Sequence, residues 1–217
     1  FQPDLLIIAP RSNGDHHNVW DAVRGTTKRI RTNEADTEYT DSPALITFES
    51  DGFDLDTTDV NYNGSSRTYC GWQWSTDGAS AATNEDGSRD SSVMVNTTHG
   101  FSIVAYTGDG SGNDTYGHGL GATPGLIWCK NLDAAQNWRV FNQGLTSGAA
   151  NSLFLNLNNA ESADPDRISA VSSTTFTAAA NMNKAEDYIA YCWAPVPGYS
   201  AFGNYEGNSN ADGTFIY

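Results

Sequence analysis

The sequence predicts an all-β protein built from two tandem β-sandwich repeat domains of the jelly-roll type. Short apolar runs alternate along the chain with clusters of Gly, Asn, Asp, Ser and Thr, the pattern of short strands joined by turns. The runs recur about every 10 residues, a spacing typical of sandwiches and jelly rolls. Helical patterns are confined to residues 20–24 and 183–187, each about one turn long.

The first half of the chain contains four runs that predict strands, at residues 5–9, 44–49, 52–55 and 68–74. Pro10 ends the first run because proline cannot donate to a β-ladder. Asn63-Gly64 is a hairpin signal because both residue types tolerate positive φ. The period of two places three side chains of the last run on one face, namely Cys70, Trp72 and Trp74.

The second half follows a polar stretch without aromatic residues, residues 76–91, which predicts a linker. Further strands are predicted at residues 93–96, 101–106, 126–130, 138–141, 153–157, 175–177 and 188–193. We therefore expect one repeat domain at residues 1–75 and a second at residues 92–196.

Two motifs occur twice, and fixed-period repeats are the strongest indication of a modular architecture. The long motif begins at Pro3 and again at Pro124, and it closes on Tyr69-Cys70-Gly71-Trp72 and on Tyr191-Cys192-Trp193. The short motif begins Gly100-Phe101-Ser102 and again Gly198-Tyr199-Ser200. The order is long, short, long, short, so the last copy of the short motif has no long motif after it.

Three arrangements account for this last copy. We expect residues 197–217 to complete the first sandwich, because Thr214-Phe215-Ile216-Tyr217 and Phe1-Gln2-Pro3-Asp4 look like neighbouring parts of one repeat. The segment could instead add as a strand to a neighbouring molecule, or its partner could lie in a longer tandem array. An unpaired strand edge is a liability that proteins rarely leave open.

Composition and charge exclude several classes of protein. The formal net charge is −15, which argues against nucleic acid as a partner because phosphate binding needs clustered Lys and Arg. The chain has six Trp, ten Tyr and nine Phe, which argues against disorder. No apolar run approaches the roughly 20 residues of a membrane-spanning helix. The three cysteines do not form a disulfide framework, so we expect buried thiols.

The second half carries a set of short motifs, namely Gly100-Phe101-Ser102-Ile103-Val104, Gly117-His118-Gly119-Leu120-Gly121, Pro124-Gly125-Leu126-Ile127, Tyr188-Ile189-Ala190-Tyr191-Cys192-Trp193 and Phe202-Gly203-Asn204-Tyr205. This set resembles repeat domains of tail-fibre-like virion proteins of tailed bacteriophages, notably marine ones. The first half matches more loosely, and residues 11–42 carry a longer charged insertion. The resemblance implies a structural protein at the virion surface, with no catalytic residues to carry over.

Two acidic segments carry oxygen ligands of the kind that calcium prefers. Asp51, Asp54 and Asp56 lie in one, and Asp109 and Asp114 bracket a turn in the other. Neither has the EF-hand order, and alternate aspartates on a strand are more often a solvated face. We expect no cofactor, with calcium as the cation that these segments could hold.

Carbohydrate binding is the alternative to a purely structural role, because exposed aromatic rings can stack on sugars. Trp20, Trp74 and Trp138 are the candidates. Trp20 and Trp138 hold roughly equivalent repeat positions, which favours core packing for both. No pair of carboxylates and no nucleophile motif stands out, so we expect no enzymatic activity.

The sequence thus favours a tail-fibre, fibril or surface-decoration subunit at the virion surface. Its expected partners are other virion proteins, further copies of itself and host-surface glycan, without membrane insertion. A glycan-binding receptor-recognition module and a cellular adhesin or filament subunit are the alternatives.

Overall fold

The computed structural model describes residues 1–215 and is nearly all β, which confirms the predicted fold class. Every strand pairing between the named strands is antiparallel, as in hairpin-connected sandwiches. No helix within residues 1–215 is long and apolar enough to cross a membrane.

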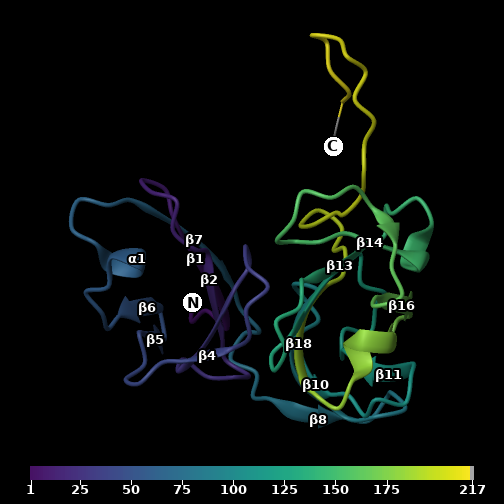
Figure 1. Cartoon of the computed structure of the whole chain (residues 1–217), viewed down its shortest axis with the longest axis horizontal. Coiled ribbons are helices and arrows are strands. Elements are labelled where there is room, and N and C mark those ends of the chain that lie inside the picture. The colour runs from purple at the N-terminus through teal and green to yellow at the C-terminus, as the bar shows by residue number, and fades with distance from the viewer. Residues whose placement is uncertain (216–217) are drawn as a thin grey trace.

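Two large sheets form the centre of the molecule (Figure 1). The first sheet has the order β4-β3-β2-β1-β7, with β4 at Tyr39–Thr40, β3 at Lys28–Arg31, β2 at Asn18–Asp21, β1 at Leu5–Pro10 and β7 at Tyr69–Trp74. The second sheet has the order β13-β12-β18-β10-β9-β8, with β13 at Arg139–Asn142, β12 at Leu126–Asn131, β18 at Asp187–Trp193, β10 at Phe101–Thr107, β9 at Ser91–Asn96 and β8 at Ala82–Asn84.

Smaller elements cover the outer faces of these sheets. They are the hairpin β5 (Ile46–Glu49) with β6 (Gly52–Leu55), the short helix α1 (Val60–Asn63), the sheet β11 (Asp114–Gly117) with β17 (Thr175–Ala178) and β16 (Ile168–Val171), the pair β14 (Asn151–Ser152) with β15 (Ser162–Ala163), and two 3₁₀ turns at Gly148–Ala150 and Ala180–Asn183.

The layers follow from three apolar clusters. Leu6, Ile8 and Trp20 pack under the β5–β6 hairpin and α1. On the opposite face of the first sheet, Leu5 and Ile7 join the central core, the cluster shared with the second sheet, which also contains Phe101, Ile103, Ile189, Tyr191 and Trp193. The remaining face of the second sheet packs on β11, β17 and β16. Both faces of β1 are therefore buried, which explains its continuous apolar run.

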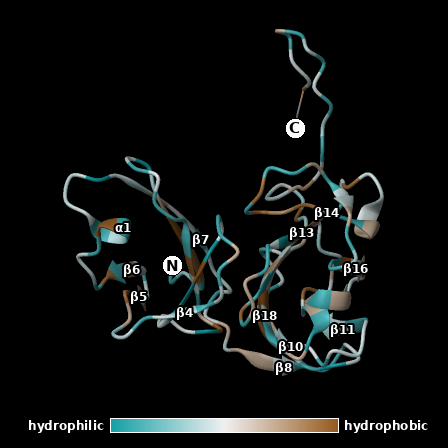
Figure 2. Cartoon of the chain, viewed as in Figure 1, coloured by the Kyte–Doolittle hydropathy of each residue, from teal (hydrophilic) through white to brown (hydrophobic). Residues whose placement is uncertain are grey.

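Figure 2 shows these hydrophobic strands in the interior and mainly hydrophilic residues along the C-terminal tail. The central core joins residues from both expected domains, including Ile7 and Tyr191. The two halves are therefore packed face to face, with a common core between their main sheets. They are not independent domains joined by a linker. Residues 76–91 also differ from a plain linker, since they contain β8, which pairs with β9.

The long repeat corresponds to a three-stranded antiparallel unit with its first strand in the middle. The order β2-β1-β7 in the first sheet matches β13-β12-β18 in the second, with antiparallel pairing throughout. The strand register corrects two expected equivalences. Leu6 lies opposite Gln73 and the equivalent Ile127 lies opposite Cys192, so Gln73, and not Cys70 as expected, corresponds to Cys192.

The same comparison changes the partner of Trp20. Trp20 lies opposite Leu6, and Phe141 lies opposite Ile127, the residue equivalent to Leu6. Trp20 therefore corresponds to Phe141 and not to Trp138. The same offset of 121 residues separates Leu5 from Leu126 and Trp20 from Phe141, because the loops at residues 11–17 and 132–138 are equal in length. The residue type shared by Trp20 and Trp138 therefore suggested the wrong partner.

Several local predictions differ from the structure. Residues 20–24 are not helical, because they comprise the end of β2 and a turn. The Asn63-Gly64 signal closes the short helix α1 and not a hairpin. The predicted strand at 153–157 is limited to an isolated bridge between Leu153 and Val140. In each case, a short polar-apolar run lacks the length needed to distinguish a strand from a turn.

Residues 197–215 do not complete the first sheet. Their one β-bridge is the isolated bridge of Ser200 with Val196. The segment then runs past the end of β13, where Asn204 Nδ2 donates to the Gly144 carbonyl at 2.7 Å. Figure 1 shows this tail leaving the body on the side of the second sheet. Ile216 and Tyr217, part of the same expectation, lie outside the described residues.

Candidate functional site

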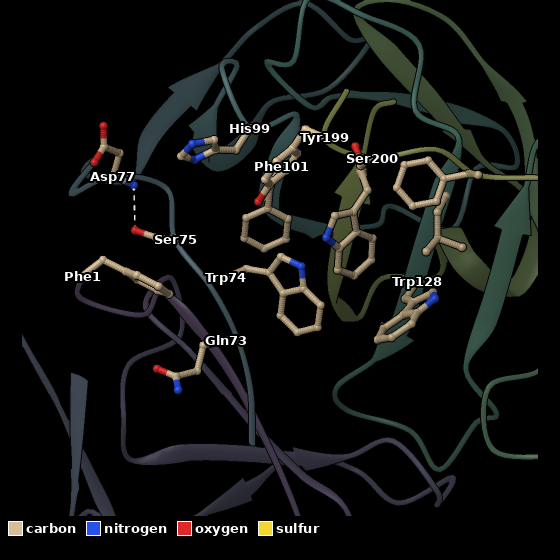
Figure 3. A pocket seen from close by; sticks show the side chains of 13 residues that line it. Phe1, Gln73, Trp74, Ser75, Asp77, His99, Phe101, Trp128, Tyr199 and Ser200 are labelled. Atoms are coloured by element: carbon tan, nitrogen blue, oxygen red, sulfur yellow. Dashed lines mark hydrogen bonds between the residues drawn. The ribbon is translucent and has the colours of Figure 1, made fainter. Parts of the chain in front are cut away.

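The candidate site is an aromatic pocket of about 570 Å³ at the end of the interface between the two large sheets (Figure 3). The aromatic pocket is lined by Trp74 from the first sheet and by Phe101, Trp128 and Trp193 from the second, with the segment around Tyr199 at its rim. Because both sheets contribute, the site exists only when the two halves are packed together.

Strand ends position these rings. Trp74 and Trp193 are the last residues of β7 and β18, and Phe101 is the first residue of β10. The Trp74 ring lies 5.6 Å from that of Trp193 at an interplanar angle of 64°, and 6.3 Å from that of Phe101. Trp128 contacts Trp193 edge to face at 4.9 Å. Each such pair contributes roughly 0.5–1.5 kcal/mol beyond its buried area.

The rim of the pocket is polar. The Asp77 amide donates to Ser75 Oγ at 2.9 Å, and Gln73 and His99 are exposed. The His99 ring stacks on Tyr199 at 5.4 Å. An apolar floor with a few polar groups at the edge is the usual composition of a small-ligand site, and indole faces suit the apolar face of a sugar ring.

The structure separates the three tryptophans considered for sugar binding. Trp74 is half-buried and lines the aromatic pocket. Trp20 and Trp138 are 0% exposed, so neither can stack on a ligand. Trp138 Nε1 donates to the Arg31 carbonyl at 2.7 Å, a bond that connects the charged insertion at residues 11–42 to the second half of the chain.

Sequence reasoning missed Trp128 and Trp193 as lining residues. Trp128 lies in the middle of β12 and Trp193 at the end of β18. Both belong to the repeated motif, which favoured a core role. Trp128 is half-buried and Trp193 is buried, and both line the pocket because they lie at the edge of the central core, which no local pattern reports.

The acidic candidates lie in two separate places. Asp51 occupies the β5–β6 turn, Asp54 lies on β6, and Asp56 accepts a bond from Thr47 Oγ1 at 2.5 Å. These side chains are on the exposed hairpin, far in the fold from the other pair.

Asp109 and Asp114 are brought together by Asn183, whose Nδ2 donates to both carboxylates at 3.3 Å and 3.0 Å. Arg89 also pairs with Asp109 at 2.9 Å. Hydrogen bonds from Ser111 hold the pKa of Asp109 below its usual value. Within residues 1–215 no group of three or more His, Cys, Asp or Glu side chains is arranged to hold a metal ion.

A buried polar cluster joins the sheets on the other side of the central core. Tyr191 OH donates to Asp21 Oδ2 at 2.7 Å, and Arg24 Nε contacts the same oxygen at 2.6 Å. Arg24 also pairs with Glu38 at 3.1 Å. Because removing one member leaves buried polar groups unpaired, this cluster fixes the orientation of the two sheets.

The three cysteines are free thiols. Burial raises the pKa of Cys129 to about 12, and burial also raises that of Cys192. Such thiols are unreactive. Cys70, on β7, is only half-buried.

Comparison with known proteins identifies the family. The family model described as Domain of unknown function (DUF7483) matches residues 1–217, so the chain belongs to this family. No curated protein and no solved structure matches the chain.

Proposed function

We propose that the chain is a non-enzymatic structural module of a bacteriophage virion, a tail-fibre, fibril or surface-decoration subunit that acts through assembly and host-surface contact. The observation that carries this proposal is an incomplete repeat. The β2-β1-β7 unit ends at β7, whereas the counterpart of β7 in the second sheet, β18, pairs on its other edge with β10, which pairs with β9. A module with one completed and one open copy of the same unit is suited to joining further modules.

Two further features support this role. The short and long motifs resemble repeats in tail-fibre-like virion proteins. The formal net charge of −15 favours a soluble, self-repelling particle surface, where contacts between subunits must be specific. Other virion proteins are the partners that this proposal requires.

The proposal is tested on purified phage particles whose genome encodes the chain. We expect mass spectrometry to detect its peptides in the particles, and gold-labelled antibodies against it to decorate tail fibres or the particle surface. Its absence from intact particles, together with its presence on the surface of uninfected cells, would instead establish the adhesin or filament alternative.

Glycan recognition is a second candidate, favoured by the aromatic pocket. Trp74 and Trp128 are both half-buried and line one cavity with a polar rim. A glycan array with the intact chain tests this. Binding that is lost at least about tenfold in Trp128→Ala, but retained in the exposed control Tyr205→Ala, supports a sugar site. Equal binding of glycan by both variants argues against a sugar site in this pocket.

A further inference from the structure

The edge of β7 and the corresponding edge of β18 differ in one respect. Within residues 1–215, β7 pairs only with β1, while β18 pairs with β12 on one side and with β10 on the other. The first residues of the short motif, Gly100-Phe101-Ser102, lead into β10. The position beside β7 that a short motif occupies in the second sheet is therefore vacant in the first sheet.

The backbone of β7 presents hydrogen-bonding groups to this vacant position. The Arg11 amide donates to the Thr68 carbonyl at 2.8 Å, so the backbone N–H and C=O groups of Thr68 point toward the side of β1. Successive residues of a strand point to alternate sides, which directs the N–H and C=O groups of Tyr69, Gly71 and Gln73 outward.

The second sheet shows how such groups are used. The Ala194 amide donates to the Gly100 carbonyl at 2.8 Å, which makes 192, 190 and 188 the positions that bond β10. By strand register these positions are equivalent to 73, 71 and 69. The outward groups of β7 are thus the same three that are satisfied in β18.

The chain carries a second short motif that could fill the vacancy. Gly198-Tyr199-Ser200 repeats Gly100-Phe101-Ser102, and the two glycines have positive φ values of 78° and 64°. Unlike β10, the second motif forms no strand in residues 199–215. Tyr199 and Tyr205 are 66% and 67% exposed.

Side-chain contacts and one isolated bridge hold this segment to its own chain. Tyr199 stacks on His99 and Ser200 bridges to Val196. Phe202 packs beside Gly125 and accepts a bond from Gln143, and Asn204 bonds Gly144. The hydrogen bonds to Gln143 and Gly144 lie just after β13, an edge strand of the second sheet. The segment would exchange them for a full strand ladder.

We infer that the unpaired edge of β7 accepts residues 199–205 of a second copy of this chain as an added antiparallel strand. This rests on the proposed function, since it supplies the linkage between modules. The register follows from the second sheet, where Phe101 lies opposite Trp193, Ile103 opposite Tyr191 and Ala105 opposite Ile189. It places Tyr199 opposite Trp74, Ala201 opposite Trp72, and Gly203 opposite Cys70.

The linkage has a direction. Each copy offers one acceptor edge and one donor segment at different places, so the contact is heterologous, and repetition yields an open filament unless the rotation closes a ring. Strand addition of this kind derives its affinity from main-chain hydrogen bonds and its specificity from alternate side chains.

A native thiol makes the register testable. Gly203 and Cys70 would form a pair without direct hydrogen bonds, whose Cα atoms approach to about 4.5 Å, within the range of a disulfide. Space for a side chain at Gly203 is open in the structure. We therefore expect Gly203→Cys, in the intact chain under mild oxidation, to form linked dimers and longer species on non-reducing gels.

Two matched variants provide the controls. Asn204→Cys places its thiol on the other face of the added strand and should yield at least about tenfold less linked dimer. The double variant Gly203→Cys with Cys70→Ser should yield none. Peptide mapping should find the bond between residues 203 and 70 of different chains.

The remaining outcomes overturn the inference. Equal linkage by the 203 and 204 variants would mean that no defined register exists. A bond within one chain would mean that the segment closes on its own sheet. A chain that stays monomeric by sedimentation at high concentration, without linkage, would mean that β7 takes some other strand. The proposed function fails separately, if the chain is absent from virions.

Discussion

Strands β7 and β18 are two copies of one sequence element placed in different surroundings. After Asp187, every residue of β18 is buried, whereas no residue of β7 is buried and Trp72 is 46% exposed. Their central neighbours β1 and β12 are similar, so the difference arises at the other edge and in the layer beyond. A repeated strand thus acquires its stability from what flanks it, and the same motif can be a core strand or an assembly surface.

The sharpest test of this comparison places proline at the equivalent positions Cys192 and Gln73. Proline removes the amide that β18 uses to bond β10, so we expect Cys192→Pro to cost about 3 kcal/mol or more, or to prevent folding. Gln73→Pro should cost less than about 1 kcal/mol, because that amide points to the vacant edge. Urea unfolding measures both, with Gln73→Val as the control that keeps the amide. A large loss in Gln73→Pro monomers would show that this edge is already paired.

Side-chain truncation at another equivalent pair should show a smaller contrast. Ile189 is 0% exposed in the central core, and we expect Ile189→Ala to lower the free energy of unfolding by about 2–5 kcal/mol. Cys70→Ala, at the matching position of half-buried β7, should cost less than about 1 kcal/mol. Equal losses by chemical denaturation would contradict the claim that the two strands differ in burial energy.

The central strands β1 and β12 differ in one buried charge. Ala9 of β1 corresponds to Lys130 of β12, which is 0% exposed and whose ammonium donates to the Asn131 carbonyl at 2.6 Å. Burial lowers the pKa of Lys130 to about 8. The unfolded chain therefore binds more protons than the folded chain between about pH 8 and pH 10.5, and stability due to this group rises with pH there.

We expect that rise, on the order of 1–3 kcal/mol, to disappear in Lys130→Met. The measurement is the difference in unfolding free energy between the parent and the variant at pH 7.5, 9 and 10, which cancels the titration of the tyrosines. Parallel pH profiles of parent and variant would mean that the amine is hydrated in the folded state.

The smallest expected effect concerns the hydroxyl of Tyr191, which occupies in β18 the position that Trp72 occupies in β7. Tyr191→Phe removes the 2.7 Å bond to Asp21 and the 3.3 Å bond that Arg24 Nη2 donates to the hydroxyl, but leaves the ion pair between Arg24 and Asp21, so we expect a loss of about 1–2 kcal/mol. Trp72→Phe should stay within about 0.5 kcal/mol. Thermal unfolding distinguishes the two, and Arg24→Met combined with Tyr191→Phe tests whether the cluster acts as a unit through non-additive losses.

Most residues that line the aromatic pocket could not be predicted from local sequence patterns. Trp74 was identified because exposed aromatic rings can stack on sugars, which is a property of the residue type. Trp128 and Trp193 were not, because their side chains become lining residues only where the edges of two sheets meet. The assignment of Trp20 and Trp138 to the core agreed with the structure, although their supposed equivalence did not, since the strand register aligns Trp20 with Phe141.

The sequence by itself determined the all-β class, most strands of the two three-stranded units, and the recurrence of the long and short motifs, because these depend on local propensity and on a period of two. Tertiary structure alone decided that the halves share the central core, that the aromatic pocket forms between them, and that residues 199–215 leave β7 unpaired. These results depend on which faces and edges meet in space, and the free energy of that choice comes from contacts between residues far apart in the chain.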